Sequence, residues 1–311
     1  MSDESVICAK SRILELFVEL EDFEIDAIEH WISSHAYKKD LESKKLLRIS
    51  EKCLIDIGET IKKLVPFHAE MPSEKITPPT IGDQADCNID NTSHVDEFLY
   101  DQDAVHVLVK SGKVARHYCV DCNSRNVKDL TLISHSMSRH ALQYIFQVLL
   151  PKDLEDKQVL DIGSRLGAVL YGAYYLSNAG TIVGIEMNKE CCEVQEKVIS
   201  QHSLDNNRIK VINSDVMDKP DVIHSSDVII INVLDFFVDI EKHKQMWHFF
   251  KKNIKKGSYL VCNRNMADTL SYLDMFEELV NWLSICKASQ MENEIFFDVE
   301  DYSELFLYTV N

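Results

Sequence analysis

The chain has 311 residues, about twice the usual domain length, so we expect one full α/β domain and a smaller N-terminal companion. Its 45% hydrophobic and 27% charged residues are typical of a globular protein that buries a core. The formal net charge of -18 argues against a surface that follows nucleic-acid phosphates. It suits a basic protein or peptide substrate better.

The nine cysteines have no disulfide-like spacing, and the N-terminus shows no basic-then-apolar leader. We therefore expect a reducing compartment, cytoplasmic or nuclear. No apolar run reaches the ~18 residues needed to cross a bilayer, so no membrane partner is expected.

The first 134 residues divide into three predicted parts. Apolar residues at helical spacing predict an N-terminal helical module over residues 1–67. Residues 68–96 carry prolines and acids with little periodicity, which is typical of an acidic flexible linker. Residues 97–134 contain two extended runs, 105–109 and 114–119, on either side of a Ser-Gly turn, and these runs predict a β-hairpin.

The remaining residues, 135–311, alternate short apolar runs with longer amphipathic segments, as in a parallel sheet flanked by helices. A helix is expected over 140–150, ended by Pro151. The predicted strands are 159–162, 181–185, 209–212, 228–232, 259–261, 295–299 and 305–310. The last two are joined by a connection too short for a crossover helix, so they should form an antiparallel pair at the end of the sheet.

Acidic residues and glycines stand where three of these strands end. Asp161 lies in the first strand and is followed by a turn with Gly163 and Gly167, which lets the backbone approach a ligand closely. Glu186 closes the second strand, where its carboxylate can accept both hydrogen bonds of a ribose diol. Asp215 follows the third strand. These strand ends should meet in one crevice.

On these motifs, the segment from residue 135 onward resembles the class I S-adenosylmethionine-dependent methyltransferases. The resemblance implies an α/β, Rossmann-like, seven-stranded sheet with an antiparallel last strand. It also implies that the first turn holds the methionine part of the cofactor, the second-strand acid the ribose, and the acid after the third strand the adenine amine. By position the cofactor-binding residues are Asp161, Gly163, Ser164, Arg165, Gly167, Glu186, Asp215, Val216 and Asn232. A nicotinamide site is disfavoured because the G-x-G-x-x-G order is absent.

Arg165 stands where that family commonly has its middle glycine. The guanidinium either contacts the cofactor carboxylate as a charge-assisted donor, or it narrows the turn and weakens binding. We favour the first interpretation, because Glu186 and Asp215 are both present at their expected strand ends.

The fourth strand is followed by Asn232 and Asp235, where the family contacts the transferring methyl and its acceptor. With residues 161–164 and 214–215, they resemble the histone-lysine methyltransferases that use this fold. Those enzymes carry two adjacent asparagines, whereas the second position here is Val233. Asn232 could also be no more than a cap at the end of the strand.

His135 precedes the predicted helix in a serine-rich run whose hydroxyls either cover the cofactor or cap that helix. His135 is a candidate base if its pKa lies near neutrality. Together Cys119, Cys122, His135 and His140 have the spacing of a two-Cys, two-His zinc site. Because the motif occurs once and lacks its aromatic core residue, two free thiols are the favoured interpretation.

Together these features favour an S-adenosylmethionine-dependent methyltransferase that acts on a protein side chain, with Asn232, Asp235 and His135 as candidate catalytic residues. The competing hypothesis is a non-catalytic scaffold of the same fold that docks a partner protein on its N-terminal helices. An RNA or small-molecule methyltransferase is the third possibility.

Overall fold

The computed structural model describes residues 2–76, 87–88, 90–121, 126–232, 234 and 236–311. Residues 1–49 and 50–311 form two compact units, so the first unit ends inside a helix and not at the predicted boundary after residue 67. Among the described residues, no helix combines the length and the apolar character needed to cross a membrane.

The first unit is helical, as the spacing of its apolar residues predicts. It contains α1 (Ser2–Val18), α2 (Asp22–Ser33) and the beginning of α3 (Tyr37–Ile61). A capping box begins α2: the Glu21 side chain accepts the backbone N–H of Glu24, and the Glu24 side chain accepts the backbone N–H of Glu21. No described side chain from residue 5 to residue 49 is buried, so the apolar positions of this unit are exposed or only partly buried.

The second unit is built on a seven-stranded sheet in the order β10-β11-β9-β8-β5-β6-β7. Strands β5 to β9 are parallel, and β11 pairs antiparallel with both β9 and β10. In chain order the strands are β5 (Gln158–Ile162), β6 (Thr181–Glu186), β7 (Ile209–Asn213), β8 (Val228–Ile231), β9 (Tyr259–Cys262), β10 (Leu283–Ile285) and β11 (Phe306–Val310). The predicted fold class is confirmed.

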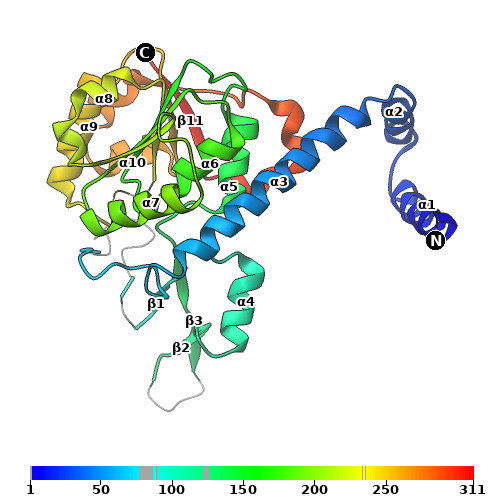
Figure 1. Cartoon of the computed structure of the whole chain (residues 1–311), viewed down its shortest axis with the longest axis horizontal. Helices are drawn as coiled ribbons and strands as arrows, with labels where there is room; N and C mark the ends of the chain where they lie inside the picture. Colours follow the sequence, from blue (N-terminus) through cyan, green and yellow to red (C-terminus); the bar gives the residue numbers. More distant parts are fainter. Residues whose placement is uncertain (1, 77–86, 89, 122–125, 233, 235) are drawn as a thin grey trace. The chain divides into compact units, whose positions relative to one another are not determined.

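Helices cover this sheet on both faces (Figure 1). One face carries α5 (Arg139–Tyr144), which continues into a π-helical turn over Ile145–Leu149, together with α6 (Ala168–Leu176) and α7 (Lys189–Gln201). The other face carries α8 (Pro220–Ser225), α9 (Ile240–Asn253) and α10 (Met266–Tyr272), whose apolar side chains pack on β5, β8 and β9. Short helical turns complete the unit: η2 (Val216–Asp218), α11 (Phe276–Leu279) and η3 (Val280–Trp282).

The predicted strand 295–299 is wrong. Two 3-10 helices, η4 (Met291–Phe296) and η5 (Val299–Tyr302), occupy this stretch, and β10 is the antiparallel partner of β11. The reason lies at the end of the π-helical turn, whose carbonyl groups need donors. Gln290 Nε2 donates to Leu150 O (2.8 Å) and Asn293 Nδ2 donates to Gln147 O (2.7 Å), which hold the segment against that turn.

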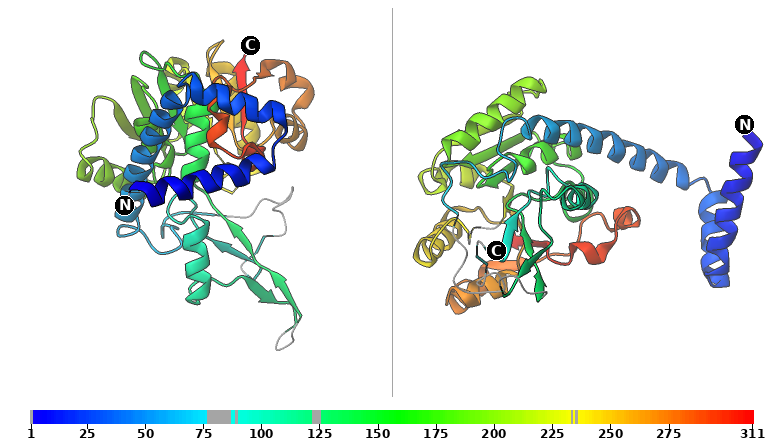
Figure 2. Two further views of the ribbon diagram at one scale, coloured as in Figure 1. Left: turned by 90° about the vertical axis from the view of Figure 1, so that its right-hand side faces the viewer. Right: turned by 90° about the horizontal axis from the view of Figure 1, so that it is seen from below.

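The predicted strand 105–109 is also wrong, because these residues lie in α4 (Gln102–Lys110). Asp101 begins the helix by accepting the backbone N–H of Ala104 at 2.8 Å, a cap that outweighs the strand preference of the valines. A hairpin does form nearby, between β2 (His117–Cys119) and β3 (Val127–Asp129). Figures 1 and 2 show α4 and this hairpin projecting side by side from the sheet.

The described part of 68–96 is not a separable linker. Ala69, Val95 and Asp96 are buried, and the Glu74 side chain is only 6% exposed. Strand β1 (Thr92–His94) pairs in parallel with β4 (Thr131–Ile133). Within this stretch, Glu74 and Asp96 supply the carboxylates that pair with a buried arginine of the sheet unit.

Strand β6 packs closely against the turn that follows β5, at Gly184. A Cβ placed on Gly184 in β6 would lie 2.7 Å from Ser164 Oγ and 2.8 Å from Leu170 Cδ1. In α3, a Cβ on Gly58 would meet only ordinary contacts, at 3.7 Å or more.

We therefore expect Gly184→Ala to lower the free energy of unfolding by about 1 to 3 kcal/mol, because the added methyl overpacks the core. Gly58→Ala is the matched control and should be neutral or stabilising by up to about 1 kcal/mol, since alanine favours the helix. Urea unfolding of both variants measures the difference. Equal stabilities would contradict the close packing of β6 on the turn.

Candidate cofactor and acceptor site

The carboxyl ends of β5, β6, β7 and β8 bring the predicted site residues to one edge of the sheet. Glu186 is the central acid of this edge. Its Oε2 accepts the backbone N–H of Arg165 at 2.9 Å, and its Oε1 accepts that of Asn188 at 2.6 Å. Each carboxylate oxygen keeps a further lone pair, so the carboxylate retains acceptor capacity for a ribose diol.

The turn between β5 and α6 has the backbone shape that glycine permits. Gly163 has φ +76° and Gly167 has φ +86°, both in the left-handed region. Among the described residues, nothing lies within 4 Å of a Cβ built on Gly163, whereas the ring of Tyr171 lies 2.7 Å from one built on Gly167. The space beside Gly163 is therefore the place where a ligand can approach the main chain.

Ser164 has a structural contact within the fold. It is buried and its hydroxyl donates to Gln195 Oε1 on α7 at 3.0 Å. Its side chain thus joins the turn to the helix layer.

Asp161 is a buried acid beside a second acid. Burial raises its pKa to about 8, and the neighbouring Glu186 carboxylate adds to the rise. The pKa of Glu186 is also raised, mainly by burial. A cationic group bound at this edge would relieve the repulsion, and S-adenosylmethionine carries both a sulfonium and an ammonium group.

The Arg165 guanidinium binds acidic and carbonyl groups of the chain itself, and its contact with a cofactor carboxylate stays a prediction. Its Nε donates to Glu74 Oε1 (2.7 Å), its Nη2 donates to Glu74 Oε2 (3.2 Å) and to Ala69 O, and its Nη1 lies 3.3 Å from Asp96 Oδ2. The guanidinium is engaged because it is 8% exposed and needs anionic partners.

Asp215 follows β7 as predicted, but its carboxylate already has partners. Oδ1 accepts the backbone N–H of Met217 (2.9 Å) and Oδ2 lies 2.9 Å from Lys242 Nζ. Partial burial acts to raise the pKa of Asp215, but these hydrogen bonds outweigh burial and hold the pKa below its usual range. An adenine amine here would share the carboxylate with Lys242, next to the backbone of Val216.

Asn232 follows β8 and is half-buried, and its Nδ2 donates to His135 O at 3.2 Å. This bond joins the end of β8 to the serine-rich run. Asp235 and Val233 lie outside the described residues.

His135 is surrounded by rings. Its centroid lies 4.8 Å from that of His94, 5.1 Å from that of Phe236 and 5.0 Å from that of Phe237. Neither ring nitrogen has a hydrogen-bond partner among the described residues. Burial, with the nearby Arg165 and His94 charges, lowers the pKa of His135 to about 3. The hypothesis of a base with a pKa near neutrality is therefore wrong, because burial opposes the charged imidazolium.

The serines of this run bond to the protein. Ser138 caps α5 by accepting the N–H of Ala141 at 3.0 Å, Ser134 accepts the N–H of Glu97 at 2.9 Å, and Ser136 Oγ donates to Asp96 at 2.5 Å. Capping is thus confirmed for Ser138.

The proposed zinc ligands are held by other contacts. Cys119 Sγ donates to Asp121 O, His135 is enclosed by aromatic rings, and the exposed His140 lies 3.4 Å from Glu51. Cys122 lies outside the described residues. In the described part of the chain, no three His, Cys, Asp or Glu side chains are grouped to hold a metal ion.

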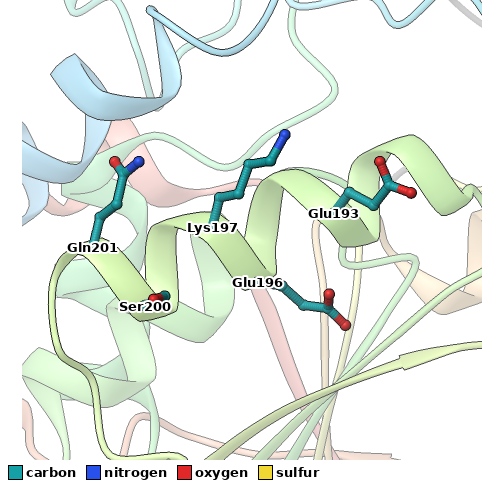
Figure 3. Close-up of a pocket in the computed structure, with 5 residues that line it drawn as sticks. All are labelled: Glu193, Glu196, Lys197, Ser200 and Gln201. Atoms are coloured by element: carbon teal, nitrogen blue, oxygen red, sulfur yellow. The ribbon is translucent and has the colours of Figure 1, made fainter.

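A surface hollow lies along α7, away from the carboxyl ends of the strands (Figure 3). Its lining is exposed and polar: Glu193, Glu196, Lys197, Ser200 and Gln201. It contains none of the acids and glycines of the crevice, so we do not place the cofactor there.

Glu74 and Asp96 were missed by the sequence analysis. They lie 91 and 69 residues before Arg165, and no spacing rule joins such distant positions. The one available signal was Arg165 itself, since a buried guanidinium requires carboxylates from some part of the fold.

Residues 153–303 match the family model of a methyltransferase domain. Similar solved structures include a putative S-adenosylmethionine-dependent methyltransferase from Streptococcus mutans (12% identity, TM-score 0.41, covering 70% of this chain and 68% of that one). Another is a putative O-methyltransferase from Klebsiella pneumoniae (12% identity, TM-score 0.38, covering 58% and 83%). A third is an RNA methyltransferase from Salinibacter ruber bound to S-adenosylhomocysteine (15% identity, TM-score 0.32, covering 40% and 72%). A comparison with curated proteins found no match.

The strand order, the glycine turn and the acid at the end of β6 define a Rossmann-like methyltransferase fold. Together with the match over residues 153–303, these features agree with the class I, S-adenosylmethionine-dependent methyltransferase domain that the sequence predicts. The open space at Gly163 and the acceptor capacity of Glu186 fit that cofactor.

The raised pKa of Asp161 predicts a pH effect on stability. An acid whose pKa is raised by folding stabilises the fold below its unfolded pKa, and this contribution is lost as the pH rises through about 8. Without cofactor, Asp161→Asn should therefore gain stability relative to wild type between about pH 5 and about pH 8. Melting temperatures of both proteins across this range measure the effect. A difference that does not change with pH would contradict it.

Glu186→Gln should weaken binding of S-adenosylhomocysteine by about 1.5 to 3 kcal/mol, the range for a hydrogen bond to a charged group. Calorimetric titration measures the loss. Glu196→Gln, in the exposed hollow of α7, is the control and should bind as wild type does. Equal affinities for all three proteins would place the ribose elsewhere.

Proposed function

We propose that this domain transfers the methyl group of S-adenosylmethionine to a side chain of a protein. The proposal rests on three residues that meet at the end of β8. The Asn232 side chain donates to the backbone carbonyl of His135, and the Phe237 ring lies beside the His135 ring. Methyl transfer needs an acceptor lone pair aligned behind the methyl in a site that excludes water. Rings and an amide next to the cofactor edge meet that need.

Each part of the cofactor is assigned to residues along the carboxyl edge of the sheet. The cofactor supplies an electrophilic methyl group. The turn at Asp161 and Gly163 would hold its methionine part, Glu186 its ribose, and Asp215 with the backbone of Val216 its adenine. Asn232 would orient the acceptor.

Charge supports a protein acceptor. The chain has a formal net charge of -18, which attracts basic segments and repels nucleic-acid phosphates. An uncharged His135 adds no positive charge to repel a lysine side chain. The exposed apolar residues of the first unit, such as Val18 (86% exposed) and Phe23 (71%), are proposed as the contact for the same protein substrate.

The test uses S-adenosylmethionine with a tritiated methyl group and fractionated cell extract. We expect label in the protein fraction with the wild-type chain and much less with Glu186→Gln. Label in RNA or in small molecules would replace the protein acceptor with that class. Wild-type protein that binds S-adenosylhomocysteine yet labels no fraction would favour the non-catalytic scaffold.

A further inference from the structure

Arg165 connects the cofactor turn to a distant part of the chain. Its guanidinium donates to both carboxylate oxygens of Glu74 and to the carbonyl of Ala69, and it also pairs with Asp96. We call residues 69–74 together with Asp96 the N-terminal clasp. The planar guanidinium suits this arrangement because its donors form a rigid fork that binds a carboxylate through two bonds.

All three charged groups are withdrawn from water. The exposed fractions of the side chains are 8% for Arg165, 6% for Glu74 and 2% for Asp96. Removing one partner from such a group leaves an uncompensated buried charge. The buried ion pairs therefore hold the turn and the clasp together, and loss of either partner would destabilise both.

The main chain of Arg165 contacts the cofactor edge at the same time. Its N–H donates to Glu186 Oε2 (2.9 Å), and its carbonyl accepts Gln195 Nε2 (2.7 Å). Its φ of +43° is uncommon for a side chain other than glycine and persists only where the surroundings fix it. The Arg165 side chain contacts the clasp, which a glycine at this position could not do.

A second contact holds the clasp beside Glu186. Asn188 Nδ2 donates to Ser73 Oγ (2.9 Å), and the Ser73 hydroxyl donates to Glu190 Oε2 (2.6 Å). The clasp thus contacts the turn after β5 and the loop after β6, the two places that frame the proposed ribose site.

We propose that Arg165 is a positioning residue that makes the N-terminal clasp part of the cofactor site, by holding the turn in the shape that Glu186 and the cofactor require. The proposal rests on the cofactor crevice used in the proposed function. It differs from a direct contact between Arg165 and the cofactor, because here the arginine acts through Glu74 and Asp96.

The first experiment is hydrogen exchange in the cofactor-free, full-length protein. Glu74→Gln keeps the size of the side chain and removes its charge. We expect faster exchange of the amides of residues 163–167, although Glu74 lies 91 residues away from Arg165. Glu59→Gln is the matched control outside the clasp, since Glu59 is 55% exposed and pairs with Lys62, and it should leave exchange at residues 163–167 unchanged. Unchanged exchange at the turn in Glu74→Gln would overturn the proposal.

The second experiment is calorimetric titration with S-adenosylhomocysteine at a temperature where every variant is folded. Glu74→Gln and Arg165→Lys should each raise Kd roughly tenfold or more, and the double variant should bind no more weakly than the weaker single one. A lower melting temperature with unchanged Kd would show a merely structural role and overturn the proposal. Failure of the wild-type protein to bind would count against the proposed function, whereas the exchange result would still decide the coupling.

Discussion

The site depends on the burial of one positive charge. A guanidinium inside a protein is tolerated only when carboxylates and carbonyls replace its water, and Arg165 obtains them from Glu74 and Asp96. This requirement draws part of the N-terminal sequence into the sheet unit. It explains why Ala69 and Asp96 are buried in a stretch whose composition is that of a linker.

The cofactor edge combines crowded negative charge with a place for a cation. Burial raises the pKa of both Asp161 and Glu186, and the Glu186 carboxylate adds to the rise at Asp161. The acceptor side is different in character, because His135 is uncharged and enclosed by aromatic rings. In the proposed function, these rings would exclude water from the place where the methyl group is transferred.

Strands β5 to β9 were predicted from sequence because buried parallel strands are short, nearly continuous apolar runs. The predictions were wrong at 105–109 and at 295–299, where apolar runs occur without strand pairing. A cap at Asp101 selects a helix in the first case. Amide bonds from Gln290 and Asn293 to a distant helical end select 3-10 turns in the second.

By itself the sequence determined the sheet class and the order of the acids and glycines along its edge, because each motif lies within one strand and the turn that follows it. The tertiary structure decided which groups Arg165 binds and whether the His135 ring can take up the second proton that would charge it. Both outcomes depend on burial and on partners from remote segments, such as Glu74 for Arg165 and His94 for His135. Local sequence encodes neither, since desolvation and long-range pairing exist only once the chain has folded.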